Sequence, residues 1–338
     1  MENGRKRKNR GNGRKKPNWK RRNPGRPKMT GWRPPKIGRS NYDRFRAEEK
    51  TVVLQEAVSL VDNTRIHEKA PGGRGRPPAK KRDLIKCLLF LILFRVTVQD
   101  SPSILPTYKD TLGVEKIPAP RTIYKYRALP ELTPILERLQ WLSAKEEWMK
   151  ETMAAADSTG YSHSKGKHWV YDRLNPKKYR EFDKAHCIVG VNSLVIPKTI
   201  VTRGSWSDKP EFRRLVEETI PDSNIRVVTA DAGYVSNENF ELAHEAGVTA
   251  YIEPKDNAVF RPHPTNGYER SVYFATRFPK RWKEAYRWRV KVECAFNSKK
   301  AMFGDVIRGK NATSRRNQAI LRDILHNLRS TMRERYGA

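Results

Sequence analysis

Apolar residues recur at helical spacing through the first half of the chain. Their spacing predicts one amphipathic helix over 46–63 and three short helices within 81–142. The three helices are expected to begin at Asp83, at Ser101 and at Pro120. The longest apolar run is 84–94, but Lys86 interrupts it and it is shorter than the roughly 20 residues of a membrane span. We interpret this run as a buried core helix and expect no membrane partner.

The second half alternates short β-branched or apolar runs with helical segments. Strands are predicted over 152–156, 185–192, 194–202, 225–230 and 249–252. Helices are predicted over 210–219, 237–246 and 280–303, the last being free of Pro and Gly. A tight turn at Asn192 and Ser193 is expected between the second and third strands. Residues 254–279, rich in Pro, Arg and aromatic residues, are expected to form a loop. The order of elements predicts an α/β domain with a mixed β-sheet flanked by helices.

Basic residues dominate the charge of the chain, which is +32 at pH 7. Residues 1–40 hold sixteen Lys or Arg against one acidic residue, Glu2, and have almost no aliphatic content. Such a segment cannot bury enough apolar surface to order itself, so we expect a disordered basic tail. The rest of the chain is basic as well, which makes a polyanion the default partner. We divide the chain into the tail (1–40), a helical DNA-binding region (41–145) and the α/β domain (146–338).

A second basic segment, rich in Gly, Arg and Pro, is expected at 70–82 and links parts of the helical region. Within it, 73–78 is Gly-Arg-Gly-Arg-Pro-Pro, which is similar to an AT-hook. Arg74 and Arg76 are therefore candidates to enter the minor groove of A·T-rich DNA. The alternative is a basic linker stiffened by proline.

The third short helix, 120–127, carries both basic and aromatic residues. Three short helices with such a third member fit a helix-turn-helix arrangement, in which Arg121, Lys125 and Arg127 would reach bases or phosphates. The alternative is a helical support packed on the α/β domain.

Cysteine and histidine do not predict a metal centre of the zinc type. Cys87, Cys187 and Cys294 are widely spaced and form no Cys-x-x-Cys pair, so we expect reduced, buried thiols. The seven histidines show no metal-ligand spacing either.

Two aspartates follow predicted strands directly. Asp157 ends the apolar run 152–157, and Asp231 ends the β-branched run 225–231. Aspartates at two strand tips, joined by a helix-borne glutamate, can hold two hard divalent cations through oxygen ligands. The alternative for each aspartate is that it caps the next turn or helix. That alternative is our interpretation of Asp208, which precedes Lys-Pro-Glu at the start of a predicted helix.

A charged stripe is predicted on the last helix of the α/β domain. Tyr286, Arg289, Glu293 and Lys300 stand at offsets 0, 3, 7 and 14, which fall within an arc of roughly 60° on one helix. The stripe joins one carboxylate to a phenol, a guanidinium and an ammonium group, a set suited to a phosphate backbone. The alternative is that Arg289 and Glu293 form an ordinary i, i+4 surface pair.

These residues resemble those of a known family, the DDE transposases of bacterial and archaeal insertion sequences. The chain is similar to the subgroup with the Tyr-(2)-Arg-(3)-Glu-(6)-Lys signature, and the resemblance runs from about Asp157 to Arg329. It implies an RNase H-like catalytic domain in which Asp157, Asp231 and Glu293 hold two Mg²⁺ ions, for which Mn²⁺ could substitute. It also implies that Tyr286, Arg289 and Lys300 contact DNA phosphates. Trp206, Trp282 and Trp288 are candidates to stack on an unpaired base, although for Trp288, which lies on the apolar arc of the predicted helix, core packing is the favoured interpretation.

The implied activity is cleavage of the ends of an insertion sequence and joining of their 3′-hydroxyls to target DNA. The implied partners are double-stranded DNA, as terminal inverted repeats and target, and a second copy of the chain in a synaptic homodimer. The implied location is the prokaryotic cytoplasm, at the nucleoid. Two alternatives stay open: an RNase H-like DNA nuclease, and a catalytically idle DNA-binding protein derived from a transposase.

Overall fold

A computed structural model describes residues 39–68, 78–163, 169–170, 179–180 and 182–337. Residues Gly38–Ala338 form one compact unit. Residues 1–38 of the predicted basic tail and residues 73–77 of the AT-hook-like segment, with Arg74 and Arg76, lie outside the described residues, and both features stay predictions; the last two residues of the predicted tail, 39 and 40, belong to a helix.

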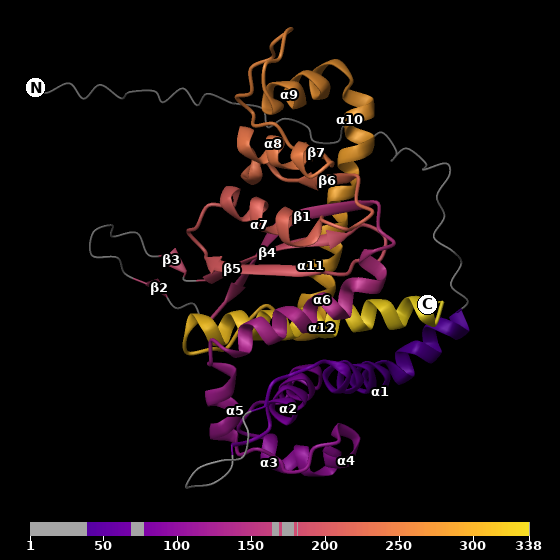
Figure 1. The fold of residues 1–338 in the computed structure, drawn as a ribbon, viewed down its shortest axis with the longest axis vertical. Helices are drawn as coiled ribbons and strands as arrows, with labels where there is room; N and C mark the ends of the chain where they lie inside the picture. The colour runs from indigo at the N-terminus through magenta and orange to yellow at the C-terminus, as the bar shows by residue number, and fades with distance from the viewer. Residues whose placement is uncertain (1–38, 69–77, 164–168, 171–178, 181, 338) are drawn as a thin grey trace, which may run out of the picture. The chain divides into compact units, whose positions relative to one another are not determined.

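Helices form most of the elements that the structure describes (Figure 1). The α-helices are α1 (Arg39–Asn63), α2 (Lys81–Leu93), α3 (Ser101–Ile104), α4 (Lys109–Leu112), α5 (Pro120–Arg127), α6 (Leu132–Trp148), α7 (Lys209–Thr219), α8 (Asn237–Glu245), α9 (Gly267–Arg277), α10 (Pro279–Tyr286), α11 (Val290–Phe303) and α12 (Ala312–Arg335). Short 3₁₀ turns are η1 (Leu105–Tyr108), η2 (Ala232–Tyr234) and η3 (Arg287–Arg289).

Two sheets are described. Five strands form the main sheet in the order β5-β4-β1-β6-β7, and two very short strands, β2 and β3, form the other. The strands are β1 (Met153–Ser162), β2 (Trp169–Val170), β3 (Tyr179–Arg180), β4 (Phe182–Gly190), β5 (Lys198–Arg203), β6 (Val227–Ala230) and β7 (Thr249–Ile252). Strands β1, β4 and β5 pair antiparallel, whereas β6 and β7 continue the sheet parallel to β1. The main sheet is therefore mixed and flanked by helices, as the sequence predicted.

Small side chains on β1 let helices approach both faces of the sheet. Ala154 and Ala156 belong to the core shared with α6, α7 and α8, whereas Ala155 belongs to the core shared with α11. Successive side chains of a strand point to opposite faces, so Asp157 lies on the same face as Ala155. The strand itself thus directs this carboxylate toward α11.

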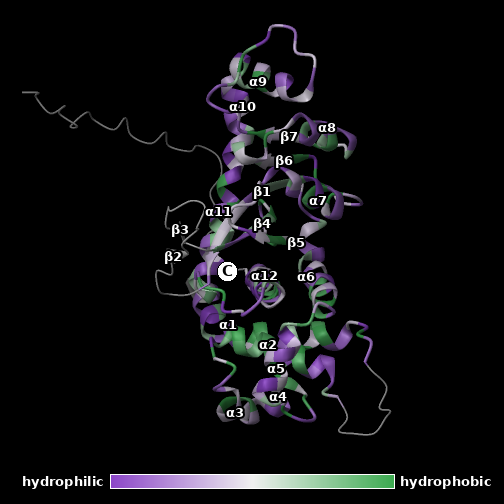
Figure 2. Cartoon of the chain, turned by 90° about the vertical axis from the view of Figure 1, so that its left-hand side faces the viewer, coloured by the Kyte–Doolittle hydropathy of each residue, from purple (hydrophilic) through white to green (hydrophobic). Residues whose placement is uncertain are grey.

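Helix α12 joins the helical region to the sheet. It runs between the sheet and helices α1 and α2 (Figure 1), and its apolar residues Ile320, Leu321 and Ile324 belong to the same core as those of α2. Helix α2 is buried along nearly its whole length, as predicted for 84–94, and Figure 2 shows it as strongly hydrophobic. The last helix thus completes the core of the first helices. The predicted domain boundary near residue 146 stays a prediction.

The predicted loop at 254–279 contains a helix, so that prediction was wrong. Helix α9 begins after Asn266, whose side-chain oxygen accepts a hydrogen bond from the Glu269 backbone N–H at 2.9 Å. Glu269 in turn accepts from the backbone and hydroxyl of Thr265. An Asn followed three residues later by Glu is a capping-box signal that could have predicted this helix.

Other boundaries also differ from the predictions. The segment after Ser101 forms α3, η1 and α4 instead of one helix, because Pro106, the second residue of η1, has no backbone N–H to continue α3. Strand β4 ends at Gly190 and β5 begins only at Lys198, so the predicted tight turn is a longer connection in which Leu194 has a positive φ of 63°. Cys87 and Cys187 are buried as expected, whereas Cys294 is exposed.

Candidate active site

Asp157 and Asp231 occupy matching positions on adjacent strands. Ala156 of β1 pairs in parallel register with Ala230 of β6. Asp157 and Asp231 are the residues that directly follow this pair, one on each strand. Asp157 is not at a strand tip, as the sequence had suggested: β1 continues to Ser162 by pairing with β4 alone. The parallel neighbour β6 ends at this level, which leaves the edge beside Asp157 free for charged groups.

Glu293 reaches the same place from α11. Arg289 donates one hydrogen bond to Asp157 at 2.8 Å and another to Glu293 at 2.6 Å. One guanidinium group therefore bridges a carboxylate of the sheet and a carboxylate of the helix. Arg289 and Glu293 are therefore not merely an i, i+4 surface pair, because Arg289 also binds Asp157, 132 positions away in the sequence.

The predicted helix 280–303 is interrupted, so the four-residue stripe does not lie on one continuous helix. The 3₁₀ turn η3 separates α10 from α11, with ψ angles near −25° at Tyr286, Arg287 and Val290. Different partners hold the two sides of this turn: Trp282 stacks on Tyr286 before it, and Arg289 binds Asp157 at its end. Neither Pro nor Gly marks the break in the sequence.

Tyr286 is engaged by a carboxylate that sequence reasoning missed. Its hydroxyl donates to Glu253 at 2.9 Å. Burial, followed by this hydrogen bond, raises the pKa of Tyr286. Glu253 follows β7 as Asp231 follows β6, because Ala230 pairs with Ile252. The strand-end rule that found the two aspartates would also have found Glu253.

Asp208, which the sequence predicted to cap α7, is a further carboxylate beside the site. It occupies the N-cap position but makes no side-chain capping bond. Instead it binds the Lys184 ammonium at 2.8 Å. Gly233 permits this arrangement: a Cβ at that position would lie 2.9 Å from an Asp208 oxygen and 3.1 Å from an Asp231 oxygen.

Negative charge is crowded and partly desolvated here. Burial raises the pKa of Asp157 to about 6; the charges of Asp231 and Glu293 add to the rise, while the Ser158 N–H and Arg289 oppose it. Burial also raises the pKa of Asp231, with a contribution from Asp208. Perturbed carboxylates of this kind are typical of functional sites.

The donor set suits a hard divalent cation. Asp157, Asp231 and Glu293 offer carboxylate oxygens only, and the two raised pKa values mark a place where added positive charge would stabilise the ionised forms. Within the part of the chain that the structure describes, no three His, Cys, Asp or Glu side chains stand in an arrangement that holds a metal ion. Arg289 bridges Asp157 and Glu293 here.

Lys300 remains on the helix of Glu293, seven residues further along α11. It is half-buried, its ammonium lies 5.9 Å from the centre of the Tyr161 ring, and burial lowers its pKa. The neighbouring Lys299 points into the core and pairs with Asp323 at 2.5 Å. Two consecutive lysines therefore have entirely different surroundings.

The predicted DNA contacts on α5 differ in their exposure to solvent. Arg121 and Lys125 are exposed on α5, one turn apart. Arg127 is only 8% exposed and donates to the Ser314 hydroxyl and the Arg308 carbonyl, so it does not share their open face. Of the three tryptophans, Trp206 is 55% exposed, whereas Trp282 is buried.

Trp288 is half-buried and packs against the core beneath α11, with Arg287 over its ring. Trp206 is therefore the one predicted stacking residue with an open ring.

This fold and site define a class of proteins in which a mixed sheet and an adjoining helix gather carboxylates. Comparison with known families is consistent with that class: the model of the transposase DDE domain matches residues 148–328. The chain belongs to this transposase family.

Other comparisons show more distant likeness. No curated protein matches the chain. The chain is similar to the piggyBac transposase in its synaptic complex with hairpin DNA, with a TM-score of 0.40 and 10% identity over 85% of this chain and 79% of that chain. It is also similar to the Drosophila P element transposase in its strand transfer complex, with a TM-score of 0.28 and 12% identity over 61% of this chain and 42% of that chain.

A search of the described helices finds none that is both long and apolar enough to cross a membrane.

Proposed function

We propose that the chain is an active DNA transposase of the insertion-sequence type, with an RNase H-like catalytic domain and the Tyr-Arg-Glu-Lys signature at Tyr286, Arg289, Glu293 and Lys300. It cleaves the ends of its element and joins their 3′-hydroxyls to target DNA. The observation that carries this proposal is the meeting of Asp157, Asp231 and Glu293 at one edge of the sheet, with Arg289 binding two of the three carboxylates.

Asp157, Asp231 and Glu293 are the residues that would hold Mg²⁺ or Mn²⁺. Two such ions, if bound there, would activate a water or a 3′-hydroxyl and would stabilise the leaving oxygen. The chain's own part is to keep these carboxylates ionised and in place. The backbone N–H of Ser158 donates to Asp157 at 2.7 Å and that of Gly233 to Asp231 at 3.0 Å, and both bonds favour the charged forms.

Basic side chains around the carboxylates would hold DNA. Arg289 has a planar fork that matches a phosphate as well as a carboxylate, so it is suited to exchange one for the other. Lys300 would hold the backbone on one side of the cut, and Arg121 and Lys125 would contact the element end from α5. A homodimer at paired ends, in the cytoplasm of a prokaryote, completes the proposal.

Substitution of the three carboxylates tests the proposal. In a supercoiled plasmid that carries the gene with its flanking DNA, Asp157→Asn, Asp231→Asn and Glu293→Gln should each reduce Mg²⁺-dependent cleavage at the element ends about a thousandfold or more. Binding to the same DNA without divalent metal should change only a few fold, because these side chains serve the chemistry more than the docking.

Glu245→Gln is the matched control, since Glu245 is an exposed carboxylate at the end of α8. It should cleave as the wild type does. If a variant still cut at the wild-type rate, the carboxylate replaced in it would not belong to the active site. Cleavage without any joined product would reassign the chain to the nucleases.

A further inference from the structure

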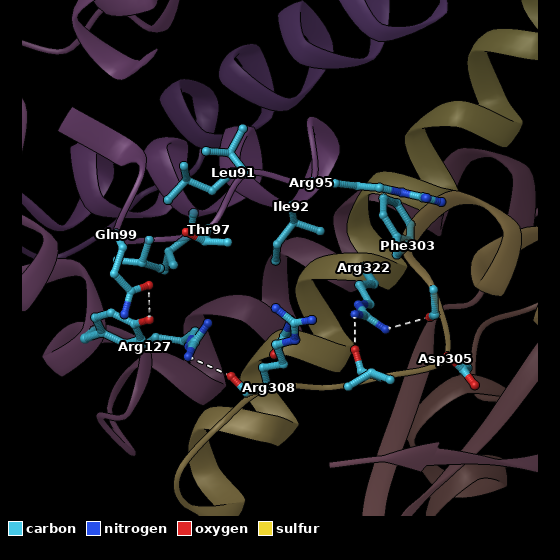
Figure 3. A pocket seen from close by; sticks show the side chains of 17 residues that line it. Leu91, Ile92, Arg95, Thr97, Gln99, Arg127, Phe303, Asp305, Arg308 and Arg322 are labelled. Carbon is cyan, nitrogen blue, oxygen red and sulfur yellow. Dashed lines mark hydrogen bonds between the residues drawn. The ribbon is translucent and has the colours of Figure 1, made fainter. Parts of the chain in front are cut away.

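A cavity of about 350 Å³ lies between α2 and the segment that joins α11 to α12 (Figure 3). Its apolar wall comes from Leu88, Leu91 and Ile92 of α2, together with Phe303. The charged side chains that line it are Arg95, Arg127, Arg308 and Arg322, and one carboxylate, Asp305. Nothing in the proposed cleavage chemistry uses this cavity.

Two of the guanidinium groups are buried. Arg322 is 4% exposed and donates to the carbonyls of Gly304 at 3.0 Å and Val306 at 2.6 Å. Its Nε is buried and has no hydrogen-bond partner. Leaving a buried donor of this kind unpaired costs about 1–3 kcal/mol. Arg127, 8% exposed, binds the Ser314 hydroxyl and the Arg308 carbonyl.

The other two guanidinium groups belong to exposed residues. Arg95 donates to the carbonyls of Met302 and Ala301 at the end of α11, and its own backbone has a positive φ of 57°. A left-handed conformation is unfavourable for arginine and persists only where the surroundings hold it. The side chain of Arg308 is exposed. Figure 3 shows both residues beside the buried Arg322.

Positive charge in the cavity is not compensated by the protein. Among the described residues, none of these four arginines forms an ion pair within 4.0 Å of a carboxylate. Burial lowers the pKa of both Arg127 and Arg322, which records the cost of keeping these charges away from water. Asp305 is the one carboxylate in the lining, against four arginines; Asp323, already paired with Lys299, also acts on Arg322 from the core. A multivalent anion is therefore the ligand that the lining favours.

We propose that this cavity binds a phosphoryl group. Guanidinium forks match the tetrahedral oxygens of phosphate, and a phosphoryl group has enough acceptors to use several donors at once. The group would come either from a free phosphate anion or from a phosphate of the DNA backbone. Its place matters because Arg95 and Arg127 from the helical region converge with Arg322 on the backbone of 301–308, which spans the end of the helix that carries Glu293 and the residues after it.

Arg308→Gln is the test variant, with Lys310→Gln as the control. Both residues are exposed, both changes remove one positive charge, and Lys310 lies two positions further along the same segment but does not line the cavity. In the first arm the full chain is melted with increasing inorganic phosphate at constant ionic strength. In the second arm, binding to a short labelled duplex is measured at several salt concentrations. Neither arm contains divalent metal, so neither depends on the proposed cleavage.

A free anion is identified if inorganic phosphate raises the Tm of the wild type and of Lys310→Gln saturably, while Arg308→Gln needs about tenfold more phosphate or does not respond. A backbone phosphate is identified if free phosphate has no saturable effect and Arg308→Gln weakens duplex binding about tenfold more than Lys310→Gln does. The proposal is overturned if phosphate has no saturable effect and the two variants lose the same DNA affinity.

Discussion

Glu293 and Lys299 lie about two turns apart on α11 and belong to two sites that differ in how far buried charge is neutralised. In the core, Lys299 and Asp323 are 1% and 0% exposed and face each other at 2.5 Å, while the Thr199 hydroxyl donates to the second Asp323 oxygen. At the sheet edge, Arg289 binds both Asp157 and Glu293, and Asp231 accepts a hydrogen bond from the nearby Gly233 N–H.

The pKa values record the difference. Burial lowers the pKa of Lys299, but Asp323, Cys187 and Tyr161 together raise it by more, so Lys299 keeps its charge in the core. At the sheet edge, burial and neighbouring carboxylates raise the pKa of Asp157 to about 6 despite Arg289. A scaffold pair is thus complete within the protein, whereas the candidate active site has more negative charge than the protein neutralises. A divalent cation, or Arg289 in another position, would neutralise this excess of negative charge.

Breaking the core pair should have the largest effect on stability. Lys299→Met leaves Asp323 buried without its cation, and Asp323→Leu does the converse, so each should lower the free energy of unfolding by about 3–5 kcal/mol. The double variant should recover much of the loss, because no unpaired charge is left. Urea unfolding of the full chain measures all three.

Lys300→Met is the control for Lys299→Met, since it removes the neighbouring lysine of the same helix. It should cost less than about 1 kcal/mol, as half-buried surface charges usually do. Equal losses at the two positions would show that the contrast between core and site is not real.

Lys300 should matter for cleavage instead. Seven residues, about 10.5 Å along the helix, separate it from Glu293, too far to share a ligand but near enough to hold the DNA backbone beside the cut. Lys300→Ala should slow single-turnover cleavage of pre-bound ends about 10- to 100-fold, while affinity falls less, and Lys300→Arg should restore part of the rate.

Lys283→Ala provides a comparison, because Lys283 is exposed on α10. If both alanine variants cut pre-bound ends at the wild-type rate, Lys300 is a surface lysine without a role in the site.

The smallest expected effect is a gain in stability. The pKa of Asp157 is about 6 in the folded chain and about 3.9 in the unfolded chain. Folding therefore favours the protonated form, so its contribution is present below about pH 4 and is lost as the pH rises through 6. In metal-free buffer at pH 7.5, Asp157→Asn should be more stable than the wild type by about 1–2 kcal/mol, and the gain should vanish near pH 4.

Urea unfolding across this pH range measures the difference, with Glu245→Gln as the control that should show none. A gain of the same size at pH 4 would mean that Asp157 is not strained by its charge. Loss of stability in the asparagine variant would mean that the Arg289 contact outweighs burial.

Local pattern was enough to predict much of this protein. Strand β7, helices α5, α7 and α8, and the mixed sheet follow from apolar period, capping residues and glycine stops, which act over a few neighbouring residues. The neighbouring positions of Asp157 and Asp231 were also predictable in outline, because residues that follow parallel strands meet at one edge of a sheet. Membership of the transposase family, proposed from the sequence, is confirmed by the family match.

Only the tertiary structure decided which charges face each other. The 3₁₀ break at Arg287–Arg289, the turn of Asp208 from α7 toward Lys184, and the burial of Arg127 have no local signal, because their causes are partners far away in the sequence. Lys299 and Lys300 make the same point most simply. Their side chains are chemically identical and adjacent, yet one completes the core and the other lies beside the site, since a helix turns by about 100° between consecutive residues.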